Sequence, residues 1–426
     1  MTNSTGNIAA DRTHPWRNLN VWLLLGGQWV SQMGNVCFTV AVFWYVLAAT
    51  HSRADLGWVG AASALTGIFS LLTGSWVDRW NRRRTLLAVD TIRGLLLAVT
   101  VVLLVVTHHL PLAMILGLVA AVNLGGTLFN PAQFALVPEV VPPEHLTAVN
   151  GVDQSATSLS QWVGYAVGGW VMSLIGVVGL IGADAATFVI SAVSLLGLRV
   201  PKASAESTAS SSSADDISLW HQIVTGQRIL WSHPFLQRAL PTALIVNFSM
   251  MTLTVLDVAW ARHVLHRGPA VYGLLESAVV VGGIVGGLLV ARLPVQWSLR
   301  TRVIASLMTT GIAMIGMSVH ASFATSIAAM AVVGVAFGVL NTTMNTTIQQ
   351  VVPNTVLGRI GGALMAVSSV SMPLGSVLAG IAGSLWPLRL VYAVAGTIVA
   401  VTSVSFFWIP AEFRAITVAA GETSSV

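Results

Sequence analysis

The chain has 426 residues, of which 55% are hydrophobic and only 8% are charged. Soluble domains carry about 25% charged residues, so this composition excludes a large soluble core and predicts a polytopic membrane protein. The formal net charge of +5 comes from 20 basic residues. Because a membrane protein gathers basic residues in its cytoplasmic loops, we expect no nucleic-acid partner. The single cysteine, Cys37, can form no disulfide within the chain.

The chain begins with a polar stretch. Residues 1–18 include Pro15 and lack the apolar core of a signal peptide, which predicts a cytoplasmic tail followed by a retained first helix. Apolar runs long enough to cross a bilayer follow. They predict an all-α membrane protein of twelve transmembrane helices over residues 19–49, 56–77, 85–107, 112–134, 147–175, 177–198, 239–261, 271–291, 302–319, 322–347, 358–382 and 387–409.

The loop Gly74–Arg84, with the sequence GSWVDRWNRRR, joins the second and third spans. A basic cluster between two spans marks the cytoplasmic side of a membrane. An ordinary loop on that side would need only the arginines. Here Gly74 also stands four residues before the pair Asp78-Arg79, which indicates a role beyond topology.

The other basic residues favour one orientation. Successive loops of a membrane protein lie on alternating sides of the membrane. With this assignment, fifteen of the 20 basic residues lie on the same side as the Gly74–Arg84 loop, and Arg93 lies inside a helix. This asymmetry follows the positive-inside rule and predicts that both termini, including the tail 411–426, are cytoplasmic. The four basic residues assigned to the outer side are Arg53, Arg262, Arg267 and Arg389.

A polar linker divides the chain. Residues 203–214 are rich in Ser and Ala and have no apolar period, which predicts a cytoplasmic linker over residues 201–218. Apolar and polar residues alternate from Leu219 to Trp231, and we expect a short amphipathic helix there on the inner membrane surface. The expected domains are therefore a six-helix bundle over 19–200 and a second bundle, with the surface helix, over 219–410.

A short internal repeat supports two halves. The triplet VVP at residues 140–142 recurs at 351–353, about half the chain length later, and Asn130 matches Asn341 at the same spacing. Parallel repeats of this size occur in secondary transporters. We therefore predict that the two bundles are pseudo-symmetric.

Asp184 and Glu276 lie within predicted spans and have no basic residue within one helical turn. An ionisable side chain inside a bilayer costs at least about 2.5 kcal/mol, so each is a candidate functional group. We predict that these two carboxyls are proton-coupling sites. The alternative is a protonated carboxyl that forms a hydrogen bond to a neighbouring helix.

Three further charged side chains in the spans are candidates for coupling. Asp90 and Arg93 are three residues apart, so they face the same way and could form a structural ion pair. Asp257 lies near the outer end of its span, and Asp153 lies near the start of its own span. Either aspartate could instead reach interfacial water.

Polar, aromatic and methionine side chains recur on several spans. Within a membrane, a polar stripe faces either a packed neighbouring helix or a water-filled cavity. We predict a substrate cavity between the halves, with packing alone as the alternative. The expected lining residues are Gln28, Trp29, Gln32, Asn35, Gln161, Tyr165, Asn247, Met250, Met251, Asn341 and Asn345.

Several motifs resemble one transporter family. The spacing G-x-x-x-D-R-x-x-R-R in the Gly74–Arg84 loop resembles the signature loop between helices 2 and 3 of the major facilitator superfamily, with Asn81 where the family usually has Gly. The stretch GYAVGG at 164–169 resembles that family's antiporter motif G-P-x-x-G-G, with Tyr165 in place of Pro. Stretches at 129–132, 226–234 and 349–359 look like the branch that holds bacterial macrolide-efflux and enterobactin-exporter-like proteins.

The resemblance implies the major facilitator fold and export driven by proton influx, through rocking of the two halves. It also implies a gating loop whose aspartate docks on the N-terminus of helix 11, a favourable place for a carboxylate. The arginine that proton-coupled relatives usually carry on helix 4 is absent. The matching residues are Gly74, Asp78, Arg79, Arg82 and Arg83 in the gating loop, and Gly164, Gly168 and Gly169 in the antiporter-like motif.

We therefore predict a secondary transporter, namely a proton-coupled exporter of drug-like neutral or cationic lipophilic compounds of the macrolide or multidrug type. A siderophore or other metabolite exporter is the alternative. A membrane enzyme or receptor would need clustered catalytic residues or an appended domain, and paired halves disfavour a channel. We expect a monomer in the bacterial cytoplasmic membrane, with a small-molecule substrate and protons as partners and no cofactor or metal.

Overall fold

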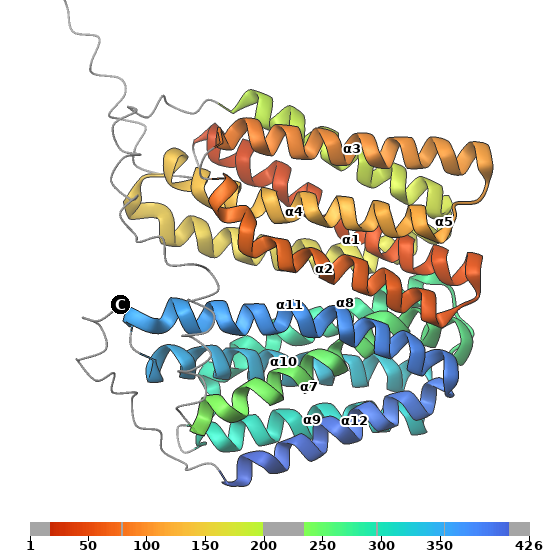
Figure 1. The fold of residues 1–426 in the computed structure, drawn as a ribbon, viewed down its shortest axis with the longest axis vertical. Coiled ribbons are helices and arrows are strands. Elements are labelled where there is room, and N and C mark those ends of the chain that lie inside the picture. Colours follow the sequence, from red (N-terminus) through yellow and green to blue (C-terminus); the bar gives the residue numbers. More distant parts are fainter. Residues whose placement is uncertain (1–17, 78–79, 199–233, 295–296, 353, 409–426) are drawn as a thin grey trace, which may run out of the picture. The chain divides into compact units, whose positions relative to one another are not determined.

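The computed structural model describes residues 18–77, 80–198, 234–294, 297–352 and 354–408 (Figure 1). Every element of regular structure in these ranges is helical. The linker 201–218, the expected surface helix at Leu219–Trp231 and the tail 411–426 lie outside the described residues, as does the tail 1–18 except for Asn18.

The elements follow the predicted spans closely. They are α1 (Leu19–Thr50), α2 (Arg53–Val77), α3 (Arg82–Thr107), α4 (Leu112–Val140), η3 (Pro143–His145), α5 (Leu146–Gly197), α7 (Pro234–Ala259), η4 (Trp260–Val264), α8 (Pro269–Leu289), η5 (Val290–Arg292), α9 (Leu299–Val319), α10 (Phe323–Val351), α11 (Asn354–Leu385), α12 (Leu388–Val404) and η6 (Ser405–Trp408).

Helix α5 consists of two consecutive helices that meet at Gly176. This residue has φ of 69° and ψ of −176°, a backbone conformation that is essentially restricted to glycine. The predicted boundary between the spans 147–175 and 177–198 is therefore confirmed. With α5 counted as two, the described residues contain the twelve predicted helices.

Polar side chains define where several helices begin. Asn18 accepts a hydrogen bond from the Asn20 amide (3.0 Å) at the start of α1. Asn81 accepts one from the Arg84 amide (3.1 Å) at the start of α3. A side-chain oxygen in this position satisfies an amide that has no partner within the helix, which stabilises the first turn.

The surfaces of these helices are those of membrane spans. Nine helices in the described part are long and apolar enough to cross a membrane, and α12 is a shorter apolar helix. Large apolar side chains such as Val106, Leu174 and Leu288 are strongly exposed. Such surfaces are unfavourable in water but are suited to lipid.

One compact unit comprises the described residues within 1–51, 65–213 and 268–273. In this first unit, α5 packs against α1 and α3, and α4 packs against α3 and α1 (Figure 1). A buried apolar cluster joins these helices. Its members include Leu24, Leu25, Leu86, Phe129, Leu136 and Leu195.

The other compact unit comprises the described residues within 52–64, 214–267 and 274–426. In this second unit, α9 packs against α10 and α12, and α7 packs against α11 and α12. A buried apolar cluster made of Val246, Val303, Leu307, Leu340, Val399 and Phe406 lies among these helices.

Candidate functional site

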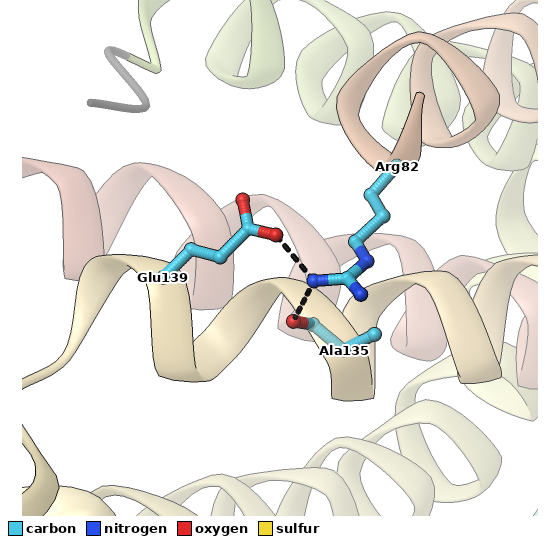
Figure 2. A network of polar contacts seen from close by, with 3 residues as sticks. All are labelled: Arg82, Ala135 and Glu139. Carbon is cyan, nitrogen blue, oxygen red and sulfur yellow. Dashed lines mark hydrogen bonds and ion pairs between the residues drawn. The ribbon is translucent and has the colours of Figure 1, made fainter. Parts of the chain in front are cut away.

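Arg82 ties the start of α3 to α4. Its Nη1 donates a hydrogen bond to the Ala135 carbonyl (3.0 Å) and forms an ion pair with the Glu139 carboxylate (Figure 2). Figure 2 shows the guanidinium reaching both groups from the first turn of α3. Both partners lie near the C-terminal end of α4, where a positive charge is also favoured by the helix dipole.

Arg83 ties the same helix start to the end of α5. Its Nε donates to the Leu195 carbonyl (2.9 Å) and its Nη2 to the Leu196 carbonyl (2.7 Å). The last carbonyls of a helix lack partners within the helix, so these bonds satisfy them. Of the other predicted gating residues, Gly74 lies in α2, and Asp78 and Arg79 lie outside the described residues.

Asp90 is fully buried between α3 and α5 in the first unit. The Ser191 hydroxyl donates a hydrogen bond of 2.6 Å to its Oδ2, and its Oδ1 has no partner among the described residues. No ion pair links Asp90 to Arg93 in the described part of the chain. The possible pairing between these residues is therefore not formed.

Arg93 is buried and binds two helices other than its own. Its Nε donates to the Val122 carbonyl on α4 (2.9 Å), and its Nη2 donates to Asn35 Oδ1 on α1 (3.2 Å). The guanidinium carbon lies 4.6 Å from the centroid of the Phe188 ring. This geometry provides a cation–π contact. The charge of Arg93 is therefore held within the packed helices.

Asp184 is fully buried against α1. The Thr187 hydroxyl donates to its Oδ1 (3.1 Å), and its Oδ2 has no hydrogen-bond partner among the described residues. A Cβ added at Gly34 would overlap both Asp184 Oδ1 and Thr187 Oγ1. The carboxyl thus sits where α1 leaves room because residue 34 has no side chain.

The second unit holds two further carboxyls, Asp257 on α7 and Glu276 on α8. Asp257 is 0% exposed and Glu276 is 8% exposed, so the alternative in which Asp257 reaches interfacial water does not hold. The Tyr392 hydroxyl donates a hydrogen bond of 2.5 Å to Asp257 Oδ1.

The Asp257–Tyr392 contact is held by a buried aromatic pair. The centroids of the Tyr392 and Trp260 rings are 4.6 Å apart. Trp260 Nε1 donates a hydrogen bond to Ser326 Oγ on α10 (3.1 Å). Trp260 begins η4, a π-helical turn that directly continues α7. The sequence analysis did not indicate Tyr392 or Trp260. Tyr392 stands out only as one of four tyrosines in the chain.

The predicted cavity residues of the first unit have varied environments. Gln28 is buried, and its Oε1 has no partner among the described residues. Trp29 Nε1 donates to Asp153 Oδ1 (2.9 Å), and Asn35 accepts the bond from Arg93. The remaining three differ in exposure: Gln32 and Tyr165 are half-buried, and Gln161 is exposed.

In the second unit, Asn247 faces a neighbouring helix. Its Nδ2 lies 3.3 Å from both the Ser368 and Ser371 hydroxyls on α11. Asn345 Nδ2 donates to Asn341 Oδ1 (2.9 Å), and both residues are exposed. Contacts with α11 therefore account for the polar side chain of Asn247. The exposed side chains of Asn341 and Asn345 on α10 can still contact other groups. Two more predicted lining residues, Met250 and Met251, are half-buried.

The glycines of the antiporter-like motif are points of close helix approach. A Cβ at Gly164 would lie 2.9 Å from Val36 Cβ, and one at Gly168 would lie 3.3 Å from Cys37 Sγ, both on α1. A Cβ at Gly169 would lie 2.5 Å from the Pro269 carbonyl, within the same unit. Small residues permit such contacts between membrane helices.

An apolar cavity of about 510 Å³ lies among α7, α11 and α12 in the second unit. Its lining includes Phe248, Thr252, Leu378, Trp386, Leu390 and Val394. None of the predicted cavity residues lines it. Three or more potential metal-ligating side chains are not grouped anywhere in the described residues.

A family model described as Major Facilitator Superfamily matches residues 24–376 and 242–424. The chain belongs to the major facilitator superfamily. The family predicted from the signature loop is therefore confirmed, and the chain is a transporter and not an enzyme. Solved structures agree on the fold. The nucleoside transporter NupG has a TM-score of 0.73 at 12% identity, over 92% of this chain and 98% of that chain. A D-xylose–proton symporter has a TM-score of 0.68 at 14% identity, over 95% and 100%.

Named relatives in this superfamily include efflux proteins. The chain is 25% identical over 371 residues to the multidrug efflux pump Tap of Mycolicibacterium fortuitum, which covers 84% of this chain and 88% of that protein. It is 23% identical over 376 residues to macrolide efflux protein A of Streptococcus pyogenes, which covers 87% and 91%. The chain is therefore a multi-pass membrane transporter with bacterial relatives.

Proposed function

We propose that this major facilitator transporter is a proton-coupled exporter of neutral or cationic lipophilic compounds. The observation that carries the proposal is the burial of four carboxyl groups in its membrane-spanning helices: Asp90, Asp184, Asp257 and Glu276. None of the four forms an ion pair with another described residue. Buried ionisable groups are costly in a bilayer and are typical of proton and ion pathways.

The direction of transport is inferred from the relatives. Two proteins that align with most of this chain are named as a multidrug efflux pump and a macrolide efflux protein. Their identity of about a quarter is low for substrate assignment but extends over both halves. Export of drug-like compounds is therefore the function that these relatives favour.

The charge of the buried residues favours neutral or cationic substrates. Arg93 is the one buried basic side chain among the described residues, and its guanidinium already binds Val122 and Asn35. A catecholate siderophore is anionic and would require several Arg or Lys donors. The siderophore alternative therefore has less support.

Transport into proteoliposomes with an imposed pH gradient tests the proposal. A cationic dye, a macrolide and a catecholate would be compared side by side, with empty liposomes as the control. We expect gradient-driven transport of the dye or the macrolide. Transport of the catecholate alone would overturn the substrate class.

Amide variants test the coupling. Asp184→Asn and Glu276→Gln resemble permanently protonated carboxyls, so at least one should abolish transport driven by the pH gradient while preserving substrate binding. Normal gradient-driven transport by both variants would show that neither carboxyl is essential. Asp90 and Asp257 would then be the remaining candidates.

We also propose the orientation predicted by the arginine distribution, with both termini in the cytoplasm and the Gly74–Arg84 loop on the same side. Cysteines introduced at Ser4 and Ser424 would be labelled by an impermeant thiol reagent only in inside-out vesicles. Labelling in right-side-out vesicles would reverse the assignment.

A further inference from the structure

A crevice of about 440 Å³ lies between α3 and α5 in the first unit. Its volume is within the range of small-molecule sites in proteins. Its walls are mostly apolar, and Asp90 is the one charged residue in its described lining. The larger cavity among α7, α11 and α12 has no charged residue in its described lining. The α3–α5 crevice is therefore the better candidate for a ligand that carries a charge.

Small residues on both helices create the α3–α5 crevice. Between membrane helices, such residues often let the backbones approach closely. Here they leave space between the larger side chains of α3 and α5, and a bulky side chain in their place would fill it. The small lining residues are Gly94 and Ala98 on α3, and Ala185, Ala186 and Ala192 on α5.

Other lining residues of the crevice are exposed on the apolar surface of the two helices. The exposed fractions of Leu95, Val189 and Val193 are 61%, 59% and 62%. Exposed apolar side chains on a membrane span are suited to contact with lipid acyl chains. A lipophilic molecule dissolved in the bilayer can therefore reach the crevice without first entering water.

Asp90 brings a buried negative charge to the crevice. The Ser191 hydroxyl donates to its Oδ2 (2.6 Å), whereas its Oδ1 has no hydrogen-bond partner and the carboxyl no ion-pair partner among the described residues. The buried charged side chains described in the first unit are Asp90, Asp184 and Arg93. When both carboxyls are ionised, one negative charge is left without a buried counter-charge. The single guanidinium already donates hydrogen bonds to α4 and α1.

An organic cation in the α3–α5 crevice would supply the missing counter-charge. Opposite charges within about 4–6 Å of each other attract strongly in a medium of low dielectric constant. This attraction needs no hydrogen bond, so it acts although Asp90 is 0% exposed. Burial of a compact, strongly hydrated ammonium is costly. The site therefore favours a cation whose charge is surrounded by apolar groups.

We propose that the α3–α5 crevice binds lipophilic organic cations from the bilayer, and that Asp90 selects for their positive charge. The apolar walls contact the hydrocarbon part of the ligand, and binding is reversible and non-covalent. This inference rests on the proposed function for the role of such cations as substrates. Binding itself is a property of the resting protein and can be measured without transport.

Equilibrium binding to the full-length protein in phosphatidylcholine nanodiscs tests the charge selection. Tetraphenylphosphonium and tetraphenylborate have the same shape and opposite charges, and each would be measured separately against nanodiscs without protein. We expect saturable binding of tetraphenylphosphonium alone. Asp90→Asn should weaken this binding by at least about tenfold, because it removes the attracting charge. Equal binding of the two ions, or unchanged affinity in Asp90→Asn, would overturn the proposal and leave an apolar crevice for acyl chains.

A second pair of variants locates the bound cation. Ala192→Leu fills part of the crevice and should also weaken tetraphenylphosphonium binding. Ala88→Leu adds the same bulk at an exposed position of α3 outside the crevice lining and should leave binding unchanged. Size-exclusion chromatography selects folded protein for every variant. Both variants retain Asp90, so they test the site even if Asp90→Asn does not fold. Unchanged binding in Ala192→Leu would overturn the proposal.

Transport assays separate this proposal from the proposed function. Gradient-driven transport of a cationic dye by a wild type that shows no charge-selective binding would overturn the crevice site and support the proposed function. Charge-selective binding that depends on Asp90 and Ala192, in a wild type without gradient-driven transport, would support the site and contradict the proposed function.

Discussion

Gly34 on α1 lies directly against the carboxyl of Asp184 on α5. Its missing side chain leaves the space that Asp184 and Thr187 occupy, and a Cβ at this position would overlap both. The position of a buried charged group in the first unit thus depends on a glycine in another helix. The contact between Gly34 and Asp184 therefore belongs both to the packing of α1 against α5 and to a candidate coupling site.

We expect Gly34→Ala to displace Asp184 and to lower the free energy of unfolding by about 1–3 kcal/mol, the usual cost of overpacking. Thermal unfolding of the purified protein would measure the loss. Gly26→Ala on the same helix is a matched control because nothing lies within 4 Å of the added Cβ. Equal stability of the two variants would contradict the proposed close contact.

Arg93→Lys should destabilise the first unit although it conserves the charge. A lysine ammonium cannot reproduce the fork with which Arg93 binds both Val122 and Asn35. Loss of one hydrogen bond to a charged group costs about 1.5–3 kcal/mol, and this should appear as a lower melting temperature. Arg84→Lys, at an exposed position of the same helix, should leave the melting temperature unchanged.

Asp78→Asn should impair transport while leaving expression nearly intact. The family resemblance implies that this carboxylate docks on the N-terminus of α11 in one state of the transport cycle, which would stabilise that state by about 0.3–1 kcal/mol or more. Arg79→Ala should behave similarly, and Arg84→Ala, outside the signature spacing, should have a milder effect. Wild-type efflux rates in Asp78→Asn would rule out this role.

Gly164→Ala should weaken the packing of α5 on α1. The added methyl group would meet Val36 Cβ at 2.9 Å and the Met33 carbonyl at 3.1 Å, so one helix must move. We expect a destabilisation of about 1–3 kcal/mol, measured by thermal unfolding. Gly151→Ala, also on α5, adds a methyl group with nothing within 4 Å and should not destabilise the protein.

The helices could be predicted from the sequence because each span is a long apolar run with local end signals. The boundary at Gly176 and the cap at Asn81 are examples in which nearby residues determine the structure. The partners of the buried charges could not be predicted in the same way. Asp90 binds Ser191, which is 101 residues away, and spacing within one helix does not reveal such a pair.

Asp257 illustrates the same limit. Its place near the end of α7 suggested contact with water, yet the neighbouring helices bury it completely. Tyr392 lies 135 residues further along the chain, so no local pattern could have connected the two. Prediction of these sites requires the arrangement of helices around each carboxyl, which depends on side-chain packing across the whole unit.

The burial of Cys37 has a practical consequence. The only cysteine of the chain is 8% exposed, and its thiol contacts the Gly164 carbonyl at 3.6 Å. Thiol-reactive probes should therefore leave it largely unmodified in the folded protein. Cysteines introduced at the helix ends could then carry spin labels or fluorophores without replacement of the native residue, and distances between them would report the conformational states of the working transporter.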